Sequence, residues 1–338
     1  MRMLSFDSFL SQGESVRALL RQLHEGRMTH ALLISGESGM GKWSLAVLIA
    51  AALLCENPGP DGEPCLKCRS CLQMADLAHP DLIILQKGKP ISSSEAKSVI
   101  PVDDIREMIS RISLRGFQSS RRVVMIRHAE DMNEAAQNKL LKTLEEPPEN
   151  TYFLLTSVKN LLLPTIISRC RPFLIHPWPE ATIRKVLADN GLTGLKADLI
   201  AAEAGGSIGK ALKNAGDESY WEFREKVIHD FLACTRRSDL LQISSRWKDS
   251  REKAEEIFSV LDTFVNHLMH QALMHSSDLS QLDGCPEKWR EFARKADPEG
   301  FIRIIEALSL ARKQVQFSVS FQVVVEQLIL MLMEAVGG

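Results

Sequence analysis

Apolar residues along the first half of the chain occur in short runs that alternate with longer amphipathic segments. Five runs have the length and composition of buried β-strands, at residues 31–35, 81–85, 122–126, 151–156 and 173–175. The segments that carry apolar positions at helical spacing lie around residues 16–23 and at 44–54, 102–113 and 133–144. This alternation predicts a parallel α/β sheet covered by helices. The helix at 44–54 is apolar on all sides, which is typical of a helix packed between a sheet and a further layer.

The second half of the chain carries no strand pattern, and Pro172, Pro177 and Pro179 mark the change. Helices are predicted at residues 181–189, 195–204, 208–215, 221–235, 250–275 and 301–332. We therefore predict three domains: an α/β domain over 1–176, a small helical domain over 177–216 with a glycine hinge at 205–207, and a second helical domain over 217–338. Residues 323–332 are too apolar for a solvent-facing helix and predict core or subunit interface.

A candidate phosphate loop follows the first predicted strand. Residues 36–43 read GESGMGKW, which fits G-x-x-x-x-G-K-[ST] except at the last position. Gly36, Gly39, Gly41 and Lys42 are the candidates to hold phosphate, through backbone N–H groups at the start of a helix and the lysine ammonium. Trp43 stands where a Ser or Thr hydroxyl would bind magnesium. We therefore predict weak nucleotide binding or none.

Four of the seven cysteines form a cluster, Cys55, Cys65, Cys68 and Cys71, spaced C-x9-C-x2-C-x2-C. Clustered thiols in such a chain predict metal ligation rather than disulfides, and four thiolates suit one tetrahedral Zn²⁺ ion. An iron–sulfur cluster is the alternative, because C-x2-C-x2-C also opens a ferredoxin pattern, although Ala75 stands near where a further cysteine would follow. A set of free thiols is the remaining alternative.

Composition limits the classes of protein that the chain can belong to. Its 338 residues are 45% hydrophobic, enough for two or three domains with a sizeable core. The net charge of −2 and the pI near 6.5 provide no overall basic field, so the isolated chain is expected to bind DNA weakly. Neither an 18-residue apolar run nor a signal-peptide pattern at residues 1–10 is present, which predicts a cytoplasmic protein without a membrane partner.

Residues 133–148, NEAAQNKLLKTLEEPP, and the triplet Ser168-Arg169-Cys170 resemble the bacterial DNA polymerase III clamp loader, in the AAA+ clamp-loader family. The order of motifs along the whole chain also resembles this family, with the phosphate loop, the four-cysteine module, DDIR at 103–106 and Gly206-Ser207 in sequence. The resemblance implies that residues 177–216 form a lid and that residues 217–338 form a collar. Through the collar the chain would assemble in a ring with motor subunits of the tau/gamma type and a delta-type subunit. The resemblance also implies action, through that complex, on a sliding clamp and primed DNA.

The positions that make the motor subunits of this family active are altered here. Arg127 and His128 stand where motors carry an Asp-Glu pair, whose acids hold magnesium and orient the attacking water. A glycine within residues 206–210 stands where the second-sensor arginine is expected. With Trp43, these changes predict a subunit without ATPase or polymerase activity. An active motor subunit of the same complex is the alternative.

Other acids lie near the altered positions. Glu130 and Asp131 could be proposed as substitutes for the missing acids, but they lie past the strand end. We predict instead that Asp131 caps the helix beginning near Asn133.

Arg169 is the residue on which the functional prediction depends. The resemblance implies that it is an arginine finger, which acts in trans on the γ-phosphate bound by a neighbouring subunit. A lone arginine would more often be a surface residue in a salt bridge. Cys170 is predicted to be a small packed residue and His79 a structural loop residue. The sequence thus predicts a non-hydrolysing subunit that positions the motors and completes a neighbour's ATP site.

Overall fold

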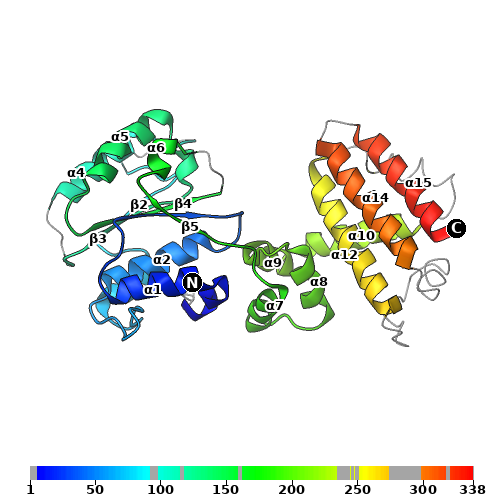
Figure 1. The fold of residues 1–338 in the computed structure, drawn as a ribbon, viewed down its shortest axis with the longest axis horizontal. Helices are drawn as coiled ribbons and strands as arrows, with labels where there is room; N and C mark the ends of the chain where they lie inside the picture. The colour runs from blue at the N-terminus through cyan, green and yellow to red at the C-terminus, as the bar shows by residue number, and fades with distance from the viewer. Residues whose placement is uncertain are drawn as a thin grey trace. The chain divides into compact units, whose positions relative to one another are not determined.

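The computed structural model describes residues 6–91, 98–114, 118–158, 162–233, 244, 247, 251–273, 298–316 and 320–337. Within it the chain forms two compact units, one of Met1–Val186 with Gly205–Lys210 and the other of Leu187–Ala204 with Ala211–Gly338. The first unit is α/β and the second is helical (Figure 1). The three-domain division stays a prediction. The predicted helix ends at residues 235 and 275 lie outside the described residues.

A five-stranded parallel sheet forms the centre of the first unit. Its strands are β1 (Ala31–Ser35), β2 (Leu82–Leu85), β3 (Arg122–Ile126), β4 (Thr151–Ser157) and β5 (Arg171–Leu174), in the order β2-β3-β4-β1-β5. β1 to β4 lie where the apolar runs predict them, whereas β5 begins two residues before its predicted start. The continuous runs of β1, β3 and β4 arise because both faces of a parallel sheet are covered. In β5 only Phe173 is buried.

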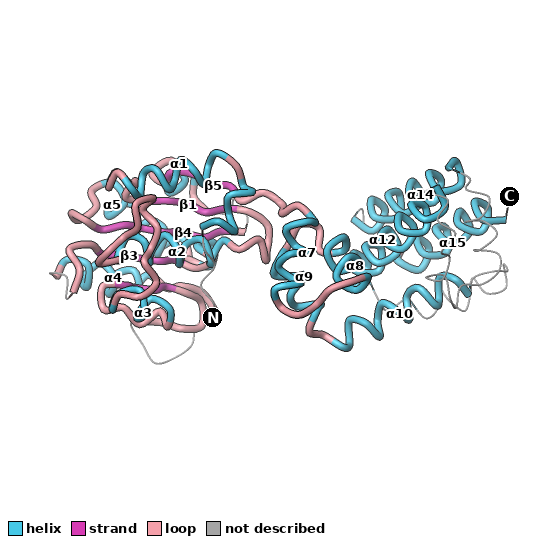
Figure 2. Tube along the Cα trace, turned by 90° about the horizontal axis from the view of Figure 1, so that it is seen from below, coloured by secondary structure: helices cyan, strands magenta, loops and turns pink. Residues whose placement is uncertain are grey.

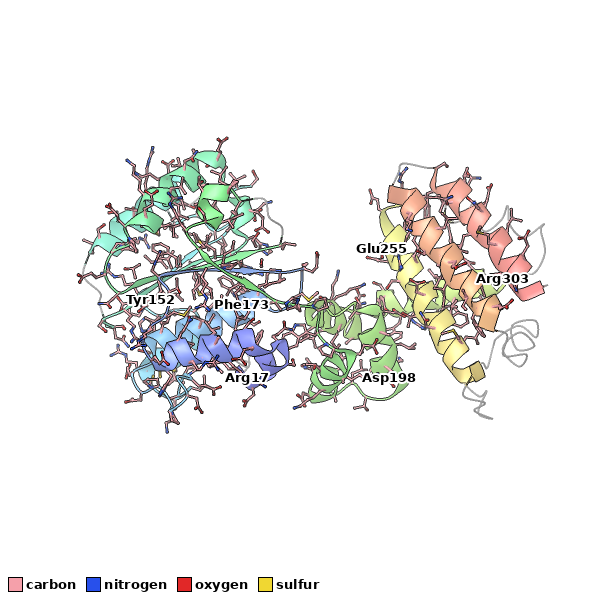
Figure 3. All side chains as sticks on the ribbon, viewed as in Figure 1. Arg17, Tyr152, Phe173, Asp198, Glu255 and Arg303 are labelled. Atoms are coloured by element: carbon pink, nitrogen blue, oxygen red, sulfur yellow. The ribbon has the colours of Figure 1, made fainter. Side chains whose placement is uncertain are left out.

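Helices cover both faces of this sheet (Figure 1). One face carries α1 (Glu14–His24) and α2 (Lys42–Leu54), and the other carries α4 (Val102–Ser113), α5 (Glu134–Glu145) and α6 (Pro164–Ile167). Successive strand residues point to opposite faces, so Ala31 and Leu33 join the buried cluster formed with α4 and α5. Residues 45–54 of α2 are all buried, which confirms the prediction made from its apolar surface. Side chains fill the space between the sheet and its helices, with Tyr152 of β4 and Phe173 of β5 labelled in Figure 3.

Short elements escaped the sequence prediction. They are η1 (Phe6–Gln12), α3 (Arg69–Ala75) within the cysteine module, η2 (Ala129–Asp131) and α6. Each has seven residues or fewer, which is about two helical turns at most, and such a length shows no clear hydrophobic period. Two of them position candidate site residues: α3 begins at the cysteines, and α6 precedes Arg169.

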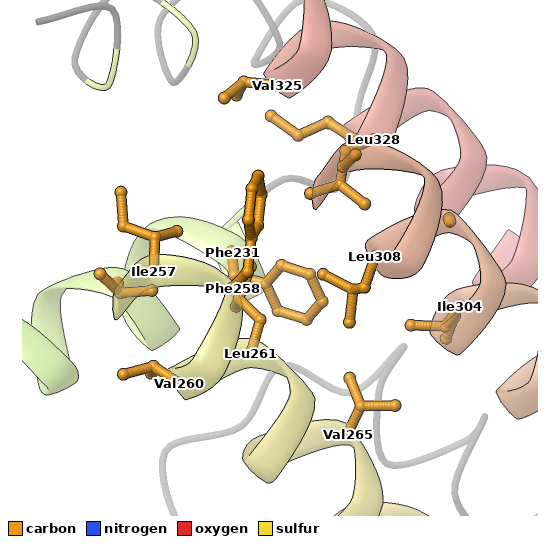
Figure 4. Close-up of a cluster of buried hydrophobic side chains, with 14 of the residues drawn as sticks. Phe231, Ile257, Phe258, Val260, Leu261, Val265, Ile304, Leu308, Val325 and Leu328 are labelled. Carbon is orange, nitrogen blue, oxygen red and sulfur yellow. The ribbon is translucent and has the colours of Figure 1, made fainter. Parts of the chain in front are cut away.

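The helical unit contains α8 (Leu195–Glu203), α10 (Glu218–Ala233), η3 (Arg251–Lys253), α12 (Ala254–Leu273), α14 (Pro298–Gln316) and α15 (Phe321–Gly337). The helices α12, α14 and α15 run side by side in both ribbon views (Figures 1 and 2). Phe231, Phe258, Leu308 and Leu328 meet in their shared apolar core (Figure 4). The helices α7 (Glu180–Asp189) and α9 (Ile208–Ala215) contribute residues to both units.

The single helical pattern predicted over residues 301–332 is wrong, because the structure has two helices there. α14 ends at Gln316 and α15 begins at Phe321. The two helices pack against each other, which one continuous helix could not do. On α15, Val324 and Leu328 are buried whereas Val323 and Leu330 are exposed, so the apolar segment is core on one side only. None of the described helices has the length and apolar character needed to cross a membrane.

Candidate functional site

The candidate nucleotide site lies at the carboxyl edge of the sheet. The phosphate loop follows β1, and Arg127 and His128 follow β3. The connection after β1 runs through α2 on one face of the sheet, and the connection after the neighbouring β4 runs through α6 on the other (Figure 1). Ligands of open α/β sheets bind at such a switch point. Gly36, Gly39 and Gly41 have φ angles of 146°, 75° and 90°, a region that side chains disfavour. The glycines are therefore required by the shape of the loop.

Lys42 is bonded within its own loop. Its ammonium donates to the carbonyl oxygens of Gly36 at 2.7 Å and Glu37 at 2.6 Å. The residue is buried, with 6% of its surface exposed, and burial lowers the pKa of its ammonium. The group that would meet a phosphate is therefore directed at loop carbonyls in this structure.

The remaining loop carbonyls are bonded to residues far along the chain. Ser207 Oγ donates to Ser38 O at 3.0 Å, the Gly209 N–H to Gly39 O at 2.8 Å, and Trp178 Nε1 to Met40 O at 2.8 Å. Every carbonyl from residue 36 to residue 40 thus accepts a hydrogen bond from this chain itself. The phosphate loop is held as a fully bonded turn, which costs free energy to deform.

The segment at residues 205–210 packs against this loop. A Cβ placed on Gly209 would lie 2.8 Å from Gly39 Cα, and one placed on Gly206 would lie 2.4 Å from Pro177 Cβ. Within the predicted hinge at residues 205–207, which stays a prediction, Gly206 packs against Pro177 and Ser207 bonds the phosphate loop. Glycine at positions 206 and 209 thus permits close backbone contact.

Trp43 of α2 and Arg127, which follows β3, contact each other. The Arg127 guanidinium carbon lies 5.3 Å from the centre of the Trp43 ring, within the range of a cation–π interaction. The sequence does not show that these residues meet, since they are 84 positions apart. The structure therefore brings an aromatic ring and a fixed positive charge together beside the phosphate loop.

His128 and Glu130 fasten the end of β3 to β4. The His128 N–H donates to Thr156 Oγ1 at 3.1 Å, and the Val158 N–H donates to Glu130 Oε1 at 3.0 Å. Burial raises the pKa of the Glu130 carboxyl, but hydrogen bonds from backbone N–H groups, including that of Val158, outweigh it and leave the pKa below its usual value. Glu130 is thus an ionised carboxylate with a local structural role.

Asp131 does not cap the following helix, so that prediction is wrong. α5 begins at Glu134, and its N-cap is Asn133, whose side-chain oxygen accepts from the Ala136 N–H at 2.8 Å. An N-cap side chain reaches the N–H groups two or three residues ahead, and Asp131 is too far back to do so.

The four cysteines converge as predicted. Their sulfur atoms all lie within 4.8 Å of one another, and the Cys55–Cys68 and Cys65–Cys71 pairs are each 3.9 Å apart. A tetrahedron with Zn–S bonds of about 2.3 Å has edges of about 3.8 Å, so this donor set fits one tetrahedral ion. Three N–H groups also point at the sulfurs, from Cys65, Cys68 and Cys71, at 3.3–3.4 Å.

A polar network joins this module to the sheet. Ser70 donates to Glu56 Oε1 from its hydroxyl at 2.8 Å, and His79 Nε2 lies 3.1 Å from Ser70 Oγ. His79 Nδ1 accepts from the Asp81 N–H at 3.1 Å, and burial lowers the pKa of the ring. Both ring nitrogens of the neutral His79 therefore have partners, Ser70 and Asp81, that are not cysteines. These contacts agree with the predicted structural role of His79.

Arg169 follows α6 at the surface, with 32% of its side chain exposed. It forms an ion pair with Glu145 through Nη2, and its Nη1 donates to Thr165 O at 2.9 Å. These contacts tie the guanidinium to its own chain, and its role as a finger stays a prediction. The α6 turn and the end of α5 bring the three residues together. Cys170 beside it is buried, and burial raises its pKa to about 12, as expected of a packed thiol.

The contacts that the sequence did not reveal come from Trp178, Gly209 and Glu145. Each joins segments that are distant along the chain, and the Trp178 bond spans 138 positions. The sequence offered only two hints of these contacts. Trp178 lies between two prolines, and Glu145 is a carboxylate in the segment before Arg169. The structure places Gly36, Gly39, Gly41 and Lys42 together in the loop after β1, and their binding of phosphate stays a prediction. Arg169 precedes β5 and lies at the opposite edge of the sheet.

A parallel α/β sheet in the order β2-β3-β4-β1-β5, with a phosphate-loop motif directly after β1, defines the protein class as P-loop proteins of the AAA+ type. The sequence model of the family described as "DNA polymerase III, delta subunit" matches residues 11–179. The chain belongs to this family. Within the clamp loaders, the sequence motifs resemble the delta-prime subunit most, and the comparisons confirm that resemblance.

The curated relatives include delta' subunits and gamma/tau subunits of DNA polymerase III. The chain is 27% identical to DNA polymerase III subunit delta' of Bacillus subtilis over 335 residues, 96% of each chain. It is 41% identical to the delta' subunit of Pseudomonas aeruginosa over 142 residues, 42% of this chain and 41% of the relative. A gamma/tau subunit of Mycobacterium bovis is 35% identical over 188 residues, 55% of this chain and 31% of that protein.

Proposed function

We propose that this chain is a delta-prime-type clamp-loader subunit that does not hydrolyse ATP and that completes the ATP site of a neighbouring subunit. The contact between Trp43 and Arg127 is the observation that carries the first half of this proposal. Hydrolysis needs a magnesium ion with its ligands and an oriented water, and these positions hold an indole ring and a guanidinium instead. Lys42 and the loop carbonyls, bonded to this chain itself, further support weak nucleotide binding or none.

The second half of the proposal assigns Arg169 as a finger acting in trans. An arginine near a neighbour's γ-phosphate stabilises charge in the transition state, and such fingers contribute roughly 10³–10⁵ in rate. Its partial exposure and its place in the Ser-Arg-Cys triplet support this role. The partners would be gamma/tau-type motors and a delta-type subunit in the cytoplasm. Through the assembled complex the chain would act on a sliding clamp and primed DNA.

The cysteine cluster is proposed to hold one structural zinc ion. The sulfur distances support a single tetrahedral ion rather than a larger cluster, whose thiolates would bind different irons and lie farther apart. When bound, zinc would contribute folding free energy to the module. The residues of this module have no part in the ATP chemistry.

An active motor subunit is the second candidate, because a gamma/tau subunit is 35% identical over about half the chain and Lys42 is retained. ATP turnover separates the two candidates. The purified chain alone should show none above background, whereas adding it to the motor subunits with primed DNA and clamp should raise their turnover. Lys42→Ala in this chain is the control and should leave that increase unchanged. Turnover by the isolated chain that Lys42→Ala abolishes would contradict the proposal.

A further inference from the structure

Glu145 is the partner of Arg169 in this structure, and its position in the helix is unusual. It is the last residue of α5, and Glu146 follows as the C-cap. The carboxyl end of a helix carries a partial negative charge, so a carboxylate there is disfavoured by about 0.3–1 kcal/mol. Two neighbouring acids at this end therefore need compensation, and the Arg169 guanidinium supplies it to the first of them.

The guanidinium is held at both of its terminal nitrogens. Nη2 pairs with Glu145, while Nη1 donates to Thr165 O at 2.9 Å and lies 3.5 Å from Ser168 Oγ. A bidentate approach to phosphate uses two N–H groups of the same fork. Glu145 thus occupies Nη2 of Arg169, a donor that a phosphate would need. Its negative charge also offsets the positive charge of the guanidinium, through which an arginine finger acts.

Both members of the pair are partly exposed, by 32% for Arg169 and 46% for Glu145. Exposed pairs of this kind are weak, because water and salt screen them and two long side chains have to be ordered. A doubly charged phosphate on a neighbouring subunit competes well against one screened carboxylate. The pair is strong enough to hold the arginine and weak enough to release it.

From these contacts we propose that Glu145 is a positioning residue that holds Arg169 on the surface of its own chain until a nucleoside triphosphate on a neighbouring subunit displaces the carboxylate. This inference rests on the proposed role of Arg169 as a finger. In the holding state the guanidinium bridges the ends of α5 and α6 with its charge compensated. In the engaged state Nη2 exchanges the carboxylate for a phosphate oxygen, and no covalent bond changes.

Kinetics of the complex reconstituted with its gamma/tau-type and delta-type subunits test the exchange. Glu145→Gln removes the competing charge and should raise kcat/KM for ATP by about two- to fivefold, the size expected for an exposed pair. Glu145→Asp keeps a carboxylate, and its kcat/KM should lie between the values of the wild type and of Glu145→Gln. The matched control is Glu146→Gln, which removes the same charge one residue away and should leave kcat/KM unchanged. An unchanged or lowered kcat/KM for Glu145→Gln would overturn the inference.

A double-mutant cycle shows whether Glu145 acts through Arg169. Glu145→Gln should have no effect in an Arg169→Ala background, whereas a general disturbance of α5 would persist there. In the isolated chain, Glu145→Gln should also speed modification of Arg169 by a dicarbonyl reagent, followed by mass spectrometry; an unchanged rate would overturn the holding contact. If Arg169→Ala leaves the complex fully active while this reactivity does change, the finger proposal fails and the contact itself stands.

Discussion

Replacing Gly209 by alanine adds one methyl group where the start of α9 meets the phosphate loop. An ideal Cβ there lies 2.8 Å from Gly39 Cα and 3.1 Å from Gly39 O. Both are backbone atoms, so no side chain can rotate away to relieve the contact. Either the loop and α9 separate or the contact remains strained.

The expected cost follows from the contacts that would be disturbed. Separation weakens the Gly209 N–H bond to Gly39 O and the Ser207 bond to Ser38 O, each about 0.5–1.5 kcal/mol. A strained contact costs about 1–3 kcal/mol. Alanine regains up to about 1 kcal/mol from its higher helix propensity, so the net loss should be about 1–2 kcal/mol.

Hydrogen exchange of residues 36–45 measures this loss locally, which matters because a chain of two units need not unfold in one transition. Exchange in Gly209→Ala should be about 5- to 30-fold faster than in the wild type. Gly216→Ala is the control, since its nearest added contact is Leu212 O at 4.0 Å, and its exchange should not change. Equal or slower exchange in Gly209→Ala would refute the close packing of α9 on the loop.

The remaining predictions concern the altered site, the metal and the thiol beside Arg169. The triple change Trp43→Thr, Arg127→Asp and His128→Glu should improve magnesium-dependent nucleotide binding in calorimetry but give little turnover in the isolated chain, because positioning is still missing; robust turnover would contradict this. Metal analysis should find one zinc per chain, and Cys68→Ser should increase proteolysis within residues 55–75 before the sheet is affected; stoichiometric iron or a stable metal-free module would contradict it. Cys170 should resist alkylation in the native chain at pH 8, because burial raises its pKa to about 12, and rapid labelling there would show that the thiol is accessible.

Strands β1 to β4 could be predicted closely because each is a largely apolar run between turns or helices. β5 could be placed only within two residues, because it begins with the exposed Arg171 and Pro172 and buries only Phe173. The boundary between α14 and α15, from Gln316 to Phe321, could not be predicted, because the apolar positions of the two helices form one continuous pattern in the sequence. Asn133 was missed as the cap because helix starts predicted from periodicity are uncertain by a residue or more, and a cap depends on one position.

The candidate sites also differ in how far the sequence predicts them. The cysteine module could be predicted from its spacing because the ligands are local in sequence, and four sulfurs within 4.8 Å agree with it. The pairing of Trp43 with Arg127 and of Glu145 with Arg169 could not, because a sequence shows residue types but not which distant segments the fold brings together. Trp178 is the same case, since its bond to Met40 O depends on the path of the chain after β5.

ATP hydrolysis by a reconstituted complex carrying Arg169→Ala tests the central claim most directly. Assembly of the variant is first verified by size-exclusion chromatography, because the arginine also bonds Thr165 O and Glu145 and its loss should cost only about 1–2 kcal/mol locally. We predict normal assembly with reduced DNA-stimulated ATP turnover and clamp loading, and poor rescue by Arg169→Lys, since an ammonium lacks the planar fork. An assembled Arg169→Ala complex that keeps full ATPase and clamp-loading rates would contradict the claim that this chain completes a neighbour's ATP site.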